Sequence, residues 1–153
     1  MDQRQRIPNS LLSSAHSSKA RSYWLRRNNF WVLINIFSKV RADAIVVNSF
    51  DELEAKKDQI KGKIVIYNEP WTNYGEAVVY RATGADRAFK YGAVAALVRS
   101  VASKSIYSVH AGVQYSKAIP IAAITVEDAE MFARMQARGQ KINLELNLEN
   151  KQE

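Results

Sequence analysis

Residues 62–99 read GKIVIYNEPWTNYGEAVVYRATGADRAFKYGAVAALVR, and this stretch decides the fold class. Two apolar runs, residues 63–67 and 93–98, predict short buried strands. Residues 76–93 between them predict a helix, after a loop punctuated by proline and glycine. A strand, a helix and a strand in this order place the chain in the α/β class.

The predicted helix carries a stripe of small residues, with Ala85, Ala88 and Gly92 near one side and Arg81 at its start. Gly84 costs about 1 kcal/mol relative to alanine inside a helix. Close approach of a neighbouring backbone is the usual reason for tolerating that cost, so we expect this helix to lie tightly against a sheet.

The preceding residues continue the alternation of strands and helices. Residues 44–47 predict a short buried strand. Ser49 and Glu52 form a capping box, in which the serine accepts the Glu52 N–H and the glutamate reaches back to the cap. We expect them to open a helix over residues 50–60 that Gly62 stops.

The later residues add a strand, a helix and a strand. Residues 119–125 predict a strand, and Thr125 caps a helix over residues 126–138. Residues 141–149 alternate strictly between apolar and polar side chains, which predicts a half-buried strand. The whole predicts a compact α/β or β/β/α domain with mixed β-sheets flanked by helices.

The composition is that of a globular domain, with 153 residues, 47% hydrophobic and 24% charged. No cysteine is present, which excludes disulfides, a thiolate nucleophile and any cysteine zinc site. The net charge of +7 lies in residues 1–41, which hold eight Lys/Arg and one acid, whereas residues 42–153 are neutral. We therefore divide the chain into a basic, poorly ordered arm (1–41), a domain (42–150) and a short tail (151–153).

The arm leaves several interpretations open. Residues 1–22 are too polar to order themselves, and the apolar run 30–37 is shorter than the roughly 20 residues that span a bilayer. A basic region before an apolar run resembles a signal peptide, although Lys39 and Arg41 follow the run, so it makes no convincing one. Its basic and aromatic side chains would also suit a membrane surface or single-stranded nucleic acid, of which the second is disfavoured.

The candidate catalytic side chains form no recognisable set. A zinc site needs three or four ligands, and the chain has two histidines, His16 and His110. The serines of the loop after residue 99 lie in no nucleophile motif: Ser100, Ser103, Ser105 and Ser108. We expect turn chemistry from these serines and a solvated His110.

The remaining candidates also have structural explanations. Glu127, Asp128 and Glu130 lie at the start of a predicted helix, where acids complement the helix dipole. Trp71 and Tyr74 are aromatic side chains of a loop that would either contact a partner or pack over the domain edge. We therefore assign no catalytic, cofactor-binding or metal-binding residue to this chain.

Several motifs resemble the protease-associated (PA) domain of the carboxypeptidase Q family of zinc exopeptidases. The general motifs are a GKIV strand, a helix ending in GA, an apolar strand and an IP strand, here residues 62–65, 92–93, 95–98 and 119–120. RSVASKSIYSVHAG and ITVEDAEM, residues 99–112 and 124–131, are closer to this family than to other PA domains. The resemblance covers about residues 43–150 and implies a swivelling β/β/α domain.

The resemblance implies that the catalytic function belongs to a domain other than this one. The family's enzymes are zinc metallocarboxypeptidases and dipeptidases, dimeric and secretory, lysosomal or extracellular, and their zinc and catalytic residues lie in a peptidase domain that resumes after the PA domain. No position here matches those residues, so we expect a fragment that is inactive alone and acts as a substrate lid or interaction module. Its partners would be the peptidase domain, a peptide substrate or a second copy.

Residues 1–41 differ from the family's leader, and the loop between Gly112 and Ile119 is shorter. The alternative is a stand-alone PA-type interaction or sorting domain.

Overall fold

The chain forms one α/β domain in the computed structural model, which describes residues 38–104, 107–110, 112 and 118–148. The predicted order of strands and helices is confirmed. The elements are β1 (Ser38–Val47), α1 (Phe50–Ala55), a 3₁₀ turn η2 (Lys57–Gln59), β2 (Ile64–Tyr67), α2 (Tyr74–Phe89), β3 (Ala95–Arg99), β4 (Ile121–Ile124), α3 (Val126–Ala137) and β5 (Ile142–Leu148).

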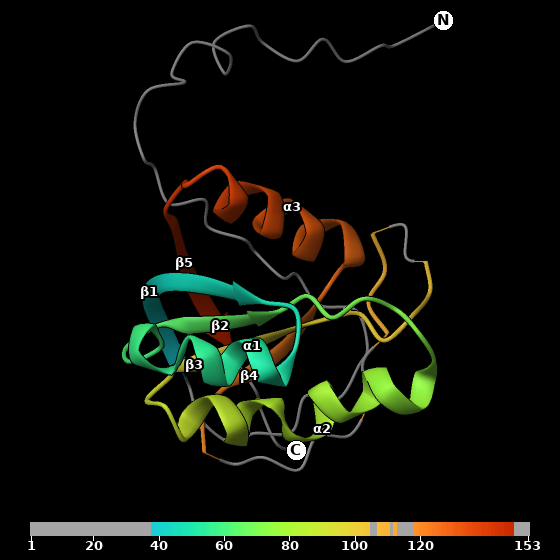
Figure 1. Cartoon of the computed structure of the whole chain (residues 1–153), viewed down its shortest axis with the longest axis horizontal. Coiled ribbons are helices and arrows are strands. Elements are labelled where there is room, and N and C mark those ends of the chain that lie inside the picture. Colours follow the sequence, from blue (N-terminus) through green and yellow to red (C-terminus); the bar gives the residue numbers. More distant parts are fainter. Residues whose placement is uncertain (1–37, 105–106, 111, 113–117, 149–153) are drawn as a thin grey trace, which may run out of the picture.

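The strands form one mixed five-stranded sheet in the order β4-β3-β2-β1-β5. β1, β2, β3 and β4 are parallel to one another. β5 runs antiparallel to the first part of β1, where Ser38 pairs with Leu148 and Ala44 with Ile142. The expected α/β class is confirmed, and the expected mixed sheets are a single sheet flanked by helices (Figure 1).

Each face of the sheet has its own apolar core. α1 and α2 cover one face, where Leu53, Ala85 and Ala88 pack on side chains of β1, β2 and β3. α3 covers the other face through Ala129 and Phe132. The two layers of helices lie on opposite sides of the sheet in Figure 1.

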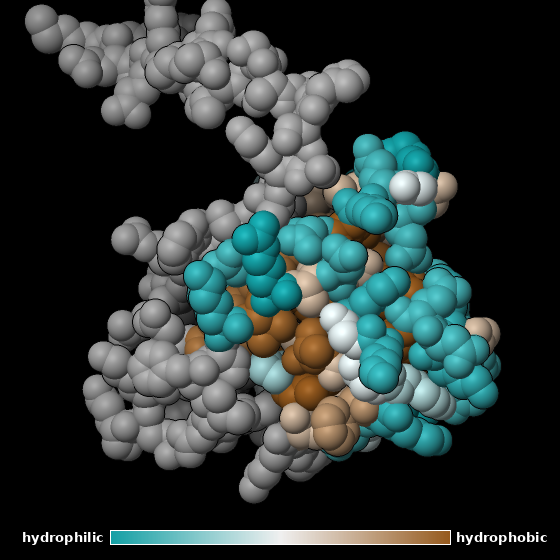
Figure 2. All heavy atoms as spheres, turned by 90° about the vertical axis from the view of Figure 1, so that its left-hand side faces the viewer, coloured by the Kyte–Doolittle hydropathy of each residue, from teal (hydrophilic) through white to brown (hydrophobic). Residues whose placement is uncertain are grey.

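The sheet curls, so that its β5 edge approaches the strands at the opposite edge. Leu144 and Leu146 of β5 line one narrow apolar gap together with Leu97 of β3 and Ile124 of β4. Several apolar side chains of this core are only partly buried, and apolar atoms remain visible between polar ones on the side of the molecule shown in Figure 2.

β1 is longer than the predicted strand 44–47. It begins at Ser38, because its first seven residues find partners on β5. Four residues that we had placed in the arm therefore belong to the sheet. The rest of the expected arm and the tail 151–153 lie outside the described residues. No helix in the part that the structure describes is long and apolar enough to cross a membrane.

Two helix boundaries differ from the prediction. α1 ends at Ala55 and continues only as the 3₁₀ turn, so Gly62 lies beyond the helix. α2 begins at Tyr74, because the Asn73 side chain accepts the Glu76 N–H and caps the helix. The residues that read as a loop are therefore its first turn.

The predicted caps of the other helices are confirmed in their main contacts. Ser49 Oγ accepts the Glu52 N–H at 3.0 Å, and Thr125 Oγ1 accepts the Asp128 N–H at 3.0 Å. The Glu52 carboxylate reaches back one residue further than expected and accepts the Asn48 N–H at 2.7 Å.

α2 packs on the sheet as closely as its glycine predicts. A Cβ atom on Gly84 would lie 2.8 Å from Tyr67 Cε2, so only glycine fits without displacing this ring. The Tyr67 hydroxyl donates a hydrogen bond to the Gly84 carbonyl at 2.7 Å. This contact fixes the height of α2 above β2 and therefore the position of Arg81, one turn earlier in the helix.

Candidate functional site

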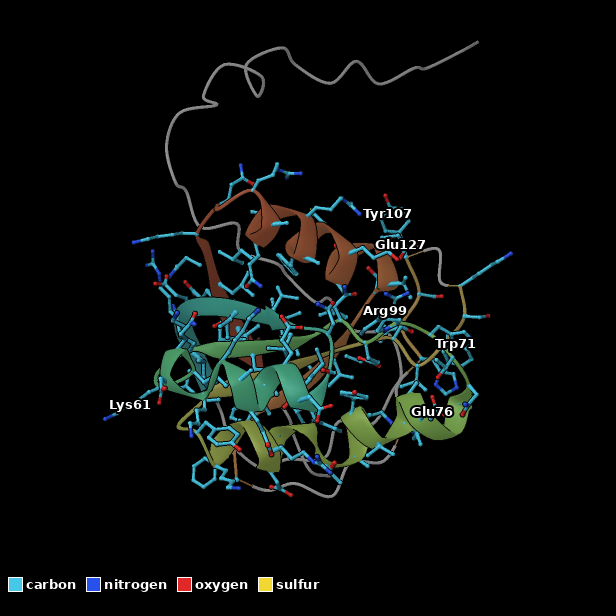
Figure 3. The ribbon with its side chains drawn as sticks, in the orientation of Figure 1. Lys61, Trp71, Glu76, Arg99, Tyr107 and Glu127 are labelled. Atoms are coloured by element: carbon cyan, nitrogen blue, oxygen red, sulfur yellow. The ribbon has the colours of Figure 1, made fainter. Side chains whose placement is uncertain are left out.

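Polar side chains gather where β2 and β3 end. Asn68 and Glu69 follow β2, and Arg99 and Ser100 lie at the end of β3. All four are buried or nearly so, although they lie at the carboxyl ends of the strands. In open α/β sheets, ligands bind outside the carboxyl ends of the strands. We call this end of the sheet, where β2 and β3 finish, the carboxyl edge. We take it as the candidate functional site, and Arg99 and Trp71 mark it in Figure 3.

Arg99 is the best compensated charge of the site. Its Nη1 donates to Asn68 Oδ1 at 3.0 Å, and its Nη2 lies 3.5 Å from the Glu130 carboxylate of α3. The Asn68 amide donates in turn to Asn48 Oδ1 at 3.3 Å. This network ties β3 to the ends of β1 and β2 and to α3.

Glu69 is a buried carboxyl group, with a side chain 4% exposed. Its Oε2 finds no hydrogen-bond partner among the residues that the structure describes. Burial raises the pKa of Glu69 to about 7, and a hydrogen bond from its own backbone together with the charge of Arg99 offsets only part of that rise. Near neutral pH, this carboxyl group is therefore divided between its neutral and ionised forms.

Arg81 is a buried cation whose contacts are weak. It is 8% exposed and extends from α2 toward the loop that follows β3. Its Nη2 donates to the Tyr74 hydroxyl at 3.3 Å, and its Nη1 lies 3.5 Å from His110 Nδ1. Its Nε has no hydrogen-bond partner in the part of the chain that the structure describes. No ion pair to Arg81 occurs among the described residues.

The loop after β3 closes over Arg81. A Cβ atom on Gly112 would lie 2.9 Å from Arg81 Cζ, so the loop backbone rests on the guanidinium. The backbone N–H of His110 donates to Ser100 Oγ at 2.8 Å, which anchors the loop to the end of β3. The Tyr74 and His110 rings meet edge to face, with their centroids 5.7 Å apart. Arg81, Tyr74 and His110 thus form one group, which we call the Arg81 cluster.

The serine and histidine candidates do not form catalytic machinery in the described residues. Ser100 is 2% exposed and accepts a backbone N–H, so it is not accessible to a substrate. Ser103 and Ser108 are exposed, as is His110. His16 and Ser105 lie outside the described residues.

The acidic candidates lie on α3, whereas the aromatic candidates lie before α2 and at its start. Glu127 and Asp128 lie in the first turn of α3, as expected, and Glu130 lies between Arg99 and Arg134. Tyr74 is 48% exposed at the start of α2, whereas Trp71 is partly buried. Within the described ranges, no group of three or more His, Cys, Asp or Glu side chains could hold a metal ion.

The sequence reasoning missed the buried charges. The sequence places Arg81 at the start of the small-residue stripe without indicating a role, and it places Glu69 and Arg99 in the loops that follow the two predicted strands. One signal was present: Arg81 shares the helix face of Gly84, Ala85 and Ala88, which are all buried. A cation on the face that packs against a sheet is a candidate for function.

The fold of this domain also occurs within a larger protein of known structure. A crystal structure of a peptidase M28 precursor from Shewanella amazonensis SB2B has the same fold, with a TM-score of 0.62 over 72% of this chain and 28% of that one. The two sequences are 22% identical, so this likeness establishes the fold alone. No family model matches the sequence.

The amino-acid sequence is similar to one particular protein, carboxypeptidase Q. The chain is 54% identical to carboxypeptidase Q of Bos taurus over 113 residues, 53% to that of Xenopus laevis and 50% to that of Homo sapiens. Each match covers 71% of this chain and 24% of the relative. The sequence resemblance is confirmed: this part of the chain is homologous to about a quarter of carboxypeptidase Q.

Proposed function

We propose that residues 38–148 are the PA domain of a carboxypeptidase Q-like peptidase and act there as an accessory domain without catalytic residues of their own. The observation that supports this proposal is the 54% identity to a segment that makes up 24% of bovine carboxypeptidase Q. The described residues contain no group suited to hold zinc, so metal ligands and catalytic groups would belong to the other three quarters of such a protein.

The domain would act through the sheet edge that carries Arg81 and Arg99. This edge combines buried charges with the exposed aromatic side chains Tyr74 and Tyr107, which is a composition suited to contact with a peptide or with another protein domain. In this role the domain covers a substrate cleft or holds the assembly together. Its partners are the peptidase domain, the peptide substrate and, in a dimer, a second copy.

The first test is hydrolysis by the 153-residue chain itself. We expect no cleavage of unblocked dipeptides, with or without added zinc, because the proposed role supplies no nucleophile or metal-bound water. Liberation of free amino acids is the measurement. Hydrolysis that a chelator abolishes would contradict the proposal.

The second test is a chimaera of bovine carboxypeptidase Q in which residues 38–148 replace the matching segment. We expect the chimaera to fold and to keep peptidase activity within about tenfold of the parent, since a homologous accessory domain preserves the geometry of its contacts. A flexible linker in place of the segment is the control and should lose most activity. A folded but inactive chimaera would count against the proposal.

A second function rests on the N-terminal residues. The basic and aromatic composition of residues 1–41 favours a stand-alone PA-type interaction or sorting domain with a membrane-directed arm. A reporter fused to residues 1–45 tests this alternative in cells. Membrane association or cleavage of the reporter supports it, and a diffuse, uncleaved reporter removes its main support.

A further inference from the structure

We propose that the Arg81 cluster is a binding site for the carboxylate group of a peptide. The inference deepens the proposed function and rests on it, because it assigns to this accessory domain a direct contact with the peptide. The ligand group would bind the guanidinium of Arg81 between the Tyr74 hydroxyl and the His110 imidazole.

Arg81 has no acidic partner among the described residues. A guanidinium has five N–H donors, and burial is costly when they are unpaired. Among the described residues the Nε has no partner, and the other two contacts are long, at 3.3 Å to the Tyr74 hydroxyl and 3.5 Å to the His110 imidazole. The molecule therefore holds a buried cation (8% exposed) ready for an anion.

The segment that includes the loop above Arg81 has no acidic side chain. Residues 100–126 contain no aspartate and no glutamate. No position of this segment can therefore supply the missing carboxylate, including the residues that the structure does not describe. The two acids of the same helix, Glu76 and Asp86, each lie five positions from Arg81 and are exposed. Glu76 accepts a hydrogen bond from the Thr72 hydroxyl.

Additional hydrogen-bond donors surround the Arg81 guanidinium. Tyr74 is the first residue of α2, so the Arg81 side chain reaches back toward the positive end of a 16-residue helix. Tyr74 is 48% exposed and His110 is exposed, so a ligand can reach the guanidinium between them. Both side chains can donate a hydrogen bond to an anion once it replaces their present contacts with Arg81.

The chemistry of these donors favours a carboxylate. Arginine forms two parallel hydrogen bonds with a planar carboxylate, which a lysine or a backbone amide cannot do. A phenol hydroxyl and an imidazole add two neutral donors to the same oxygens. The carboxylate would come from either the C-terminus of a peptide or an acidic side chain, and the experiment separates these two sources.

The experiment is an NMR titration of the ¹⁵N-labelled 153-residue chain that follows the Nε–H resonance of Arg81. The three probes are acetyl-alanyl-alanine, its C-terminal amide, and an amidated acetyl-aspartyl-alanine. We expect a saturable shift of the Nε–H signal with an acid probe, at a Kd of about 1 mM for such small ligands. A shift with the first probe assigns the site to a C-terminus, and one with the third probe to a side chain. No shift, or an equal shift with the uncharged amide, overturns the inference.

Four variants test the residues. Arg81→Met should abolish the shift of the loop amides, and Tyr74→Phe and His110→Gln should each weaken binding about fivefold. Arg87→Met is the matched control, since it removes an exposed arginine of the same helix, and it should bind as the parent does. Tyr74 and His110 are exposed, so their variants test the site even if Arg81→Met fails to fold. Unchanged binding in both of these variants contradicts the inference.

The inference and the proposed function can fail separately. An active bovine chimaera together with an unchanged Arg81 signal would reject the carboxylate site and leave the accessory role intact. An inactive chimaera together with a saturable shift would reject the accessory role and leave a peptide-binding site on a different kind of domain.

Discussion

Arg81 and Arg99 are two arginines at one edge of the sheet, and their surroundings differ. Arg99 has a 3.0 Å hydrogen bond to Asn68 and a carboxylate partner, Glu130. Arg81, on α2, makes its polar side-chain contacts among the described residues with the Tyr74 hydroxyl and the His110 imidazole. The difference arises from the chain segments that cover them: α3 brings acids, whereas the loop over Arg81 carries none.

This contrast distinguishes a charge that stabilises the fold from a charge that is available to bind a ligand. A cation with a complete set of partners contributes to the fold, and its loss leaves the partners unpaired. A buried cation without an acid costs free energy in the isolated domain, so its presence is better explained by a ligand. Glu69 is a third buried charge of this edge, and it resembles Arg81 because one of its oxygens has no partner.

The largest expected effect is the pH dependence that Glu69 gives to stability. Its pKa is raised from an ordinary value of 4.5 to about 7, so the folded state binds a proton more tightly than the unfolded state. The contribution is therefore fully present below pH 4.5 and is lost as the pH rises through about 7. A difference of this size corresponds to about 3 kcal/mol. Urea unfolding between pH 5 and pH 8 measures it.

Glu69→Gln is the control for this prediction, because it keeps the shape of the side chain and removes the titration. We expect the variant to lose most of the fall in stability between pH 5 and pH 8. An equal fall in the parent and in the variant would mean that other groups cause the pH dependence.

Arg99→Met should have the next largest effect. It leaves the buried Asn68 oxygen without its charged donor, which we expect to cost about 2 kcal/mol in the free energy of unfolding. It also removes the positive charge that lowers the pKa of Glu69, so the midpoint of the pH dependence should move upward. Chemical denaturation at several pH values measures both changes.

Glu130→Gln separates the two contacts of Arg99. The Glu130 side chain is 47% exposed and lies 3.5 Å from the arginine, so water screens most of this ion pair. We expect a loss below about 0.5 kcal/mol. A loss as large as that of Arg99→Met would show that the ion pair, and not Asn68, makes Arg99 important.

Tyr67→Phe tests the contact that sets the position of the helix carrying Arg81. It removes the buried hydrogen bond from the Tyr67 hydroxyl to the Gly84 carbonyl and should cost about 1 kcal/mol. Burial raises the pKa of Tyr67 above its ordinary value, so the hydroxyl stays protonated and donates over the whole accessible pH range. Thermal unfolding measures the cost, and a stability unchanged or increased would contradict the prediction.

The sequence predicted the elements because local signals decide them. Ser49 and Thr125 mark helix starts through their own side chains, and Gly84 indicates the close approach that the Tyr67 ring makes. The start of β1 could not be predicted, since Ser38 joins the sheet only through β5, about a hundred residues later. The start of α2 was missed because Gly75 looked like a loop residue, although Asn73 is a good N-cap.

The candidate site was predictable only in part. His110 and Tyr74 were noticed as residue types, but nothing local shows that a loop histidine lies 3.5 Å from a helix arginine 29 positions earlier. Burial of Glu69 and Arg81 likewise depends on how α2 and the loop meet the sheet. Whether a buried charge has a partner depends on tertiary packing. The local pattern of residues in a sequence does not contain that information.

Arg81→Met should change stability only slightly, and it gives the clearest test of the comparison. Methionine keeps most of the aliphatic packing and removes a buried charge that no acid compensates, so we expect a change within about 1 kcal/mol, in the stabilising direction. Arg87→Met is the matched control: it removes the cation 3.9 Å above the Phe50 ring and should cost about 0.5 kcal/mol. Unfolding of the two variants side by side measures the difference. If Arg81→Met instead loses as much stability as Arg99→Met, the two arginines serve the fold alike. An increase in stability together with the loss of the carboxylate response would mean that the domain keeps a costly charge for the sake of its ligand.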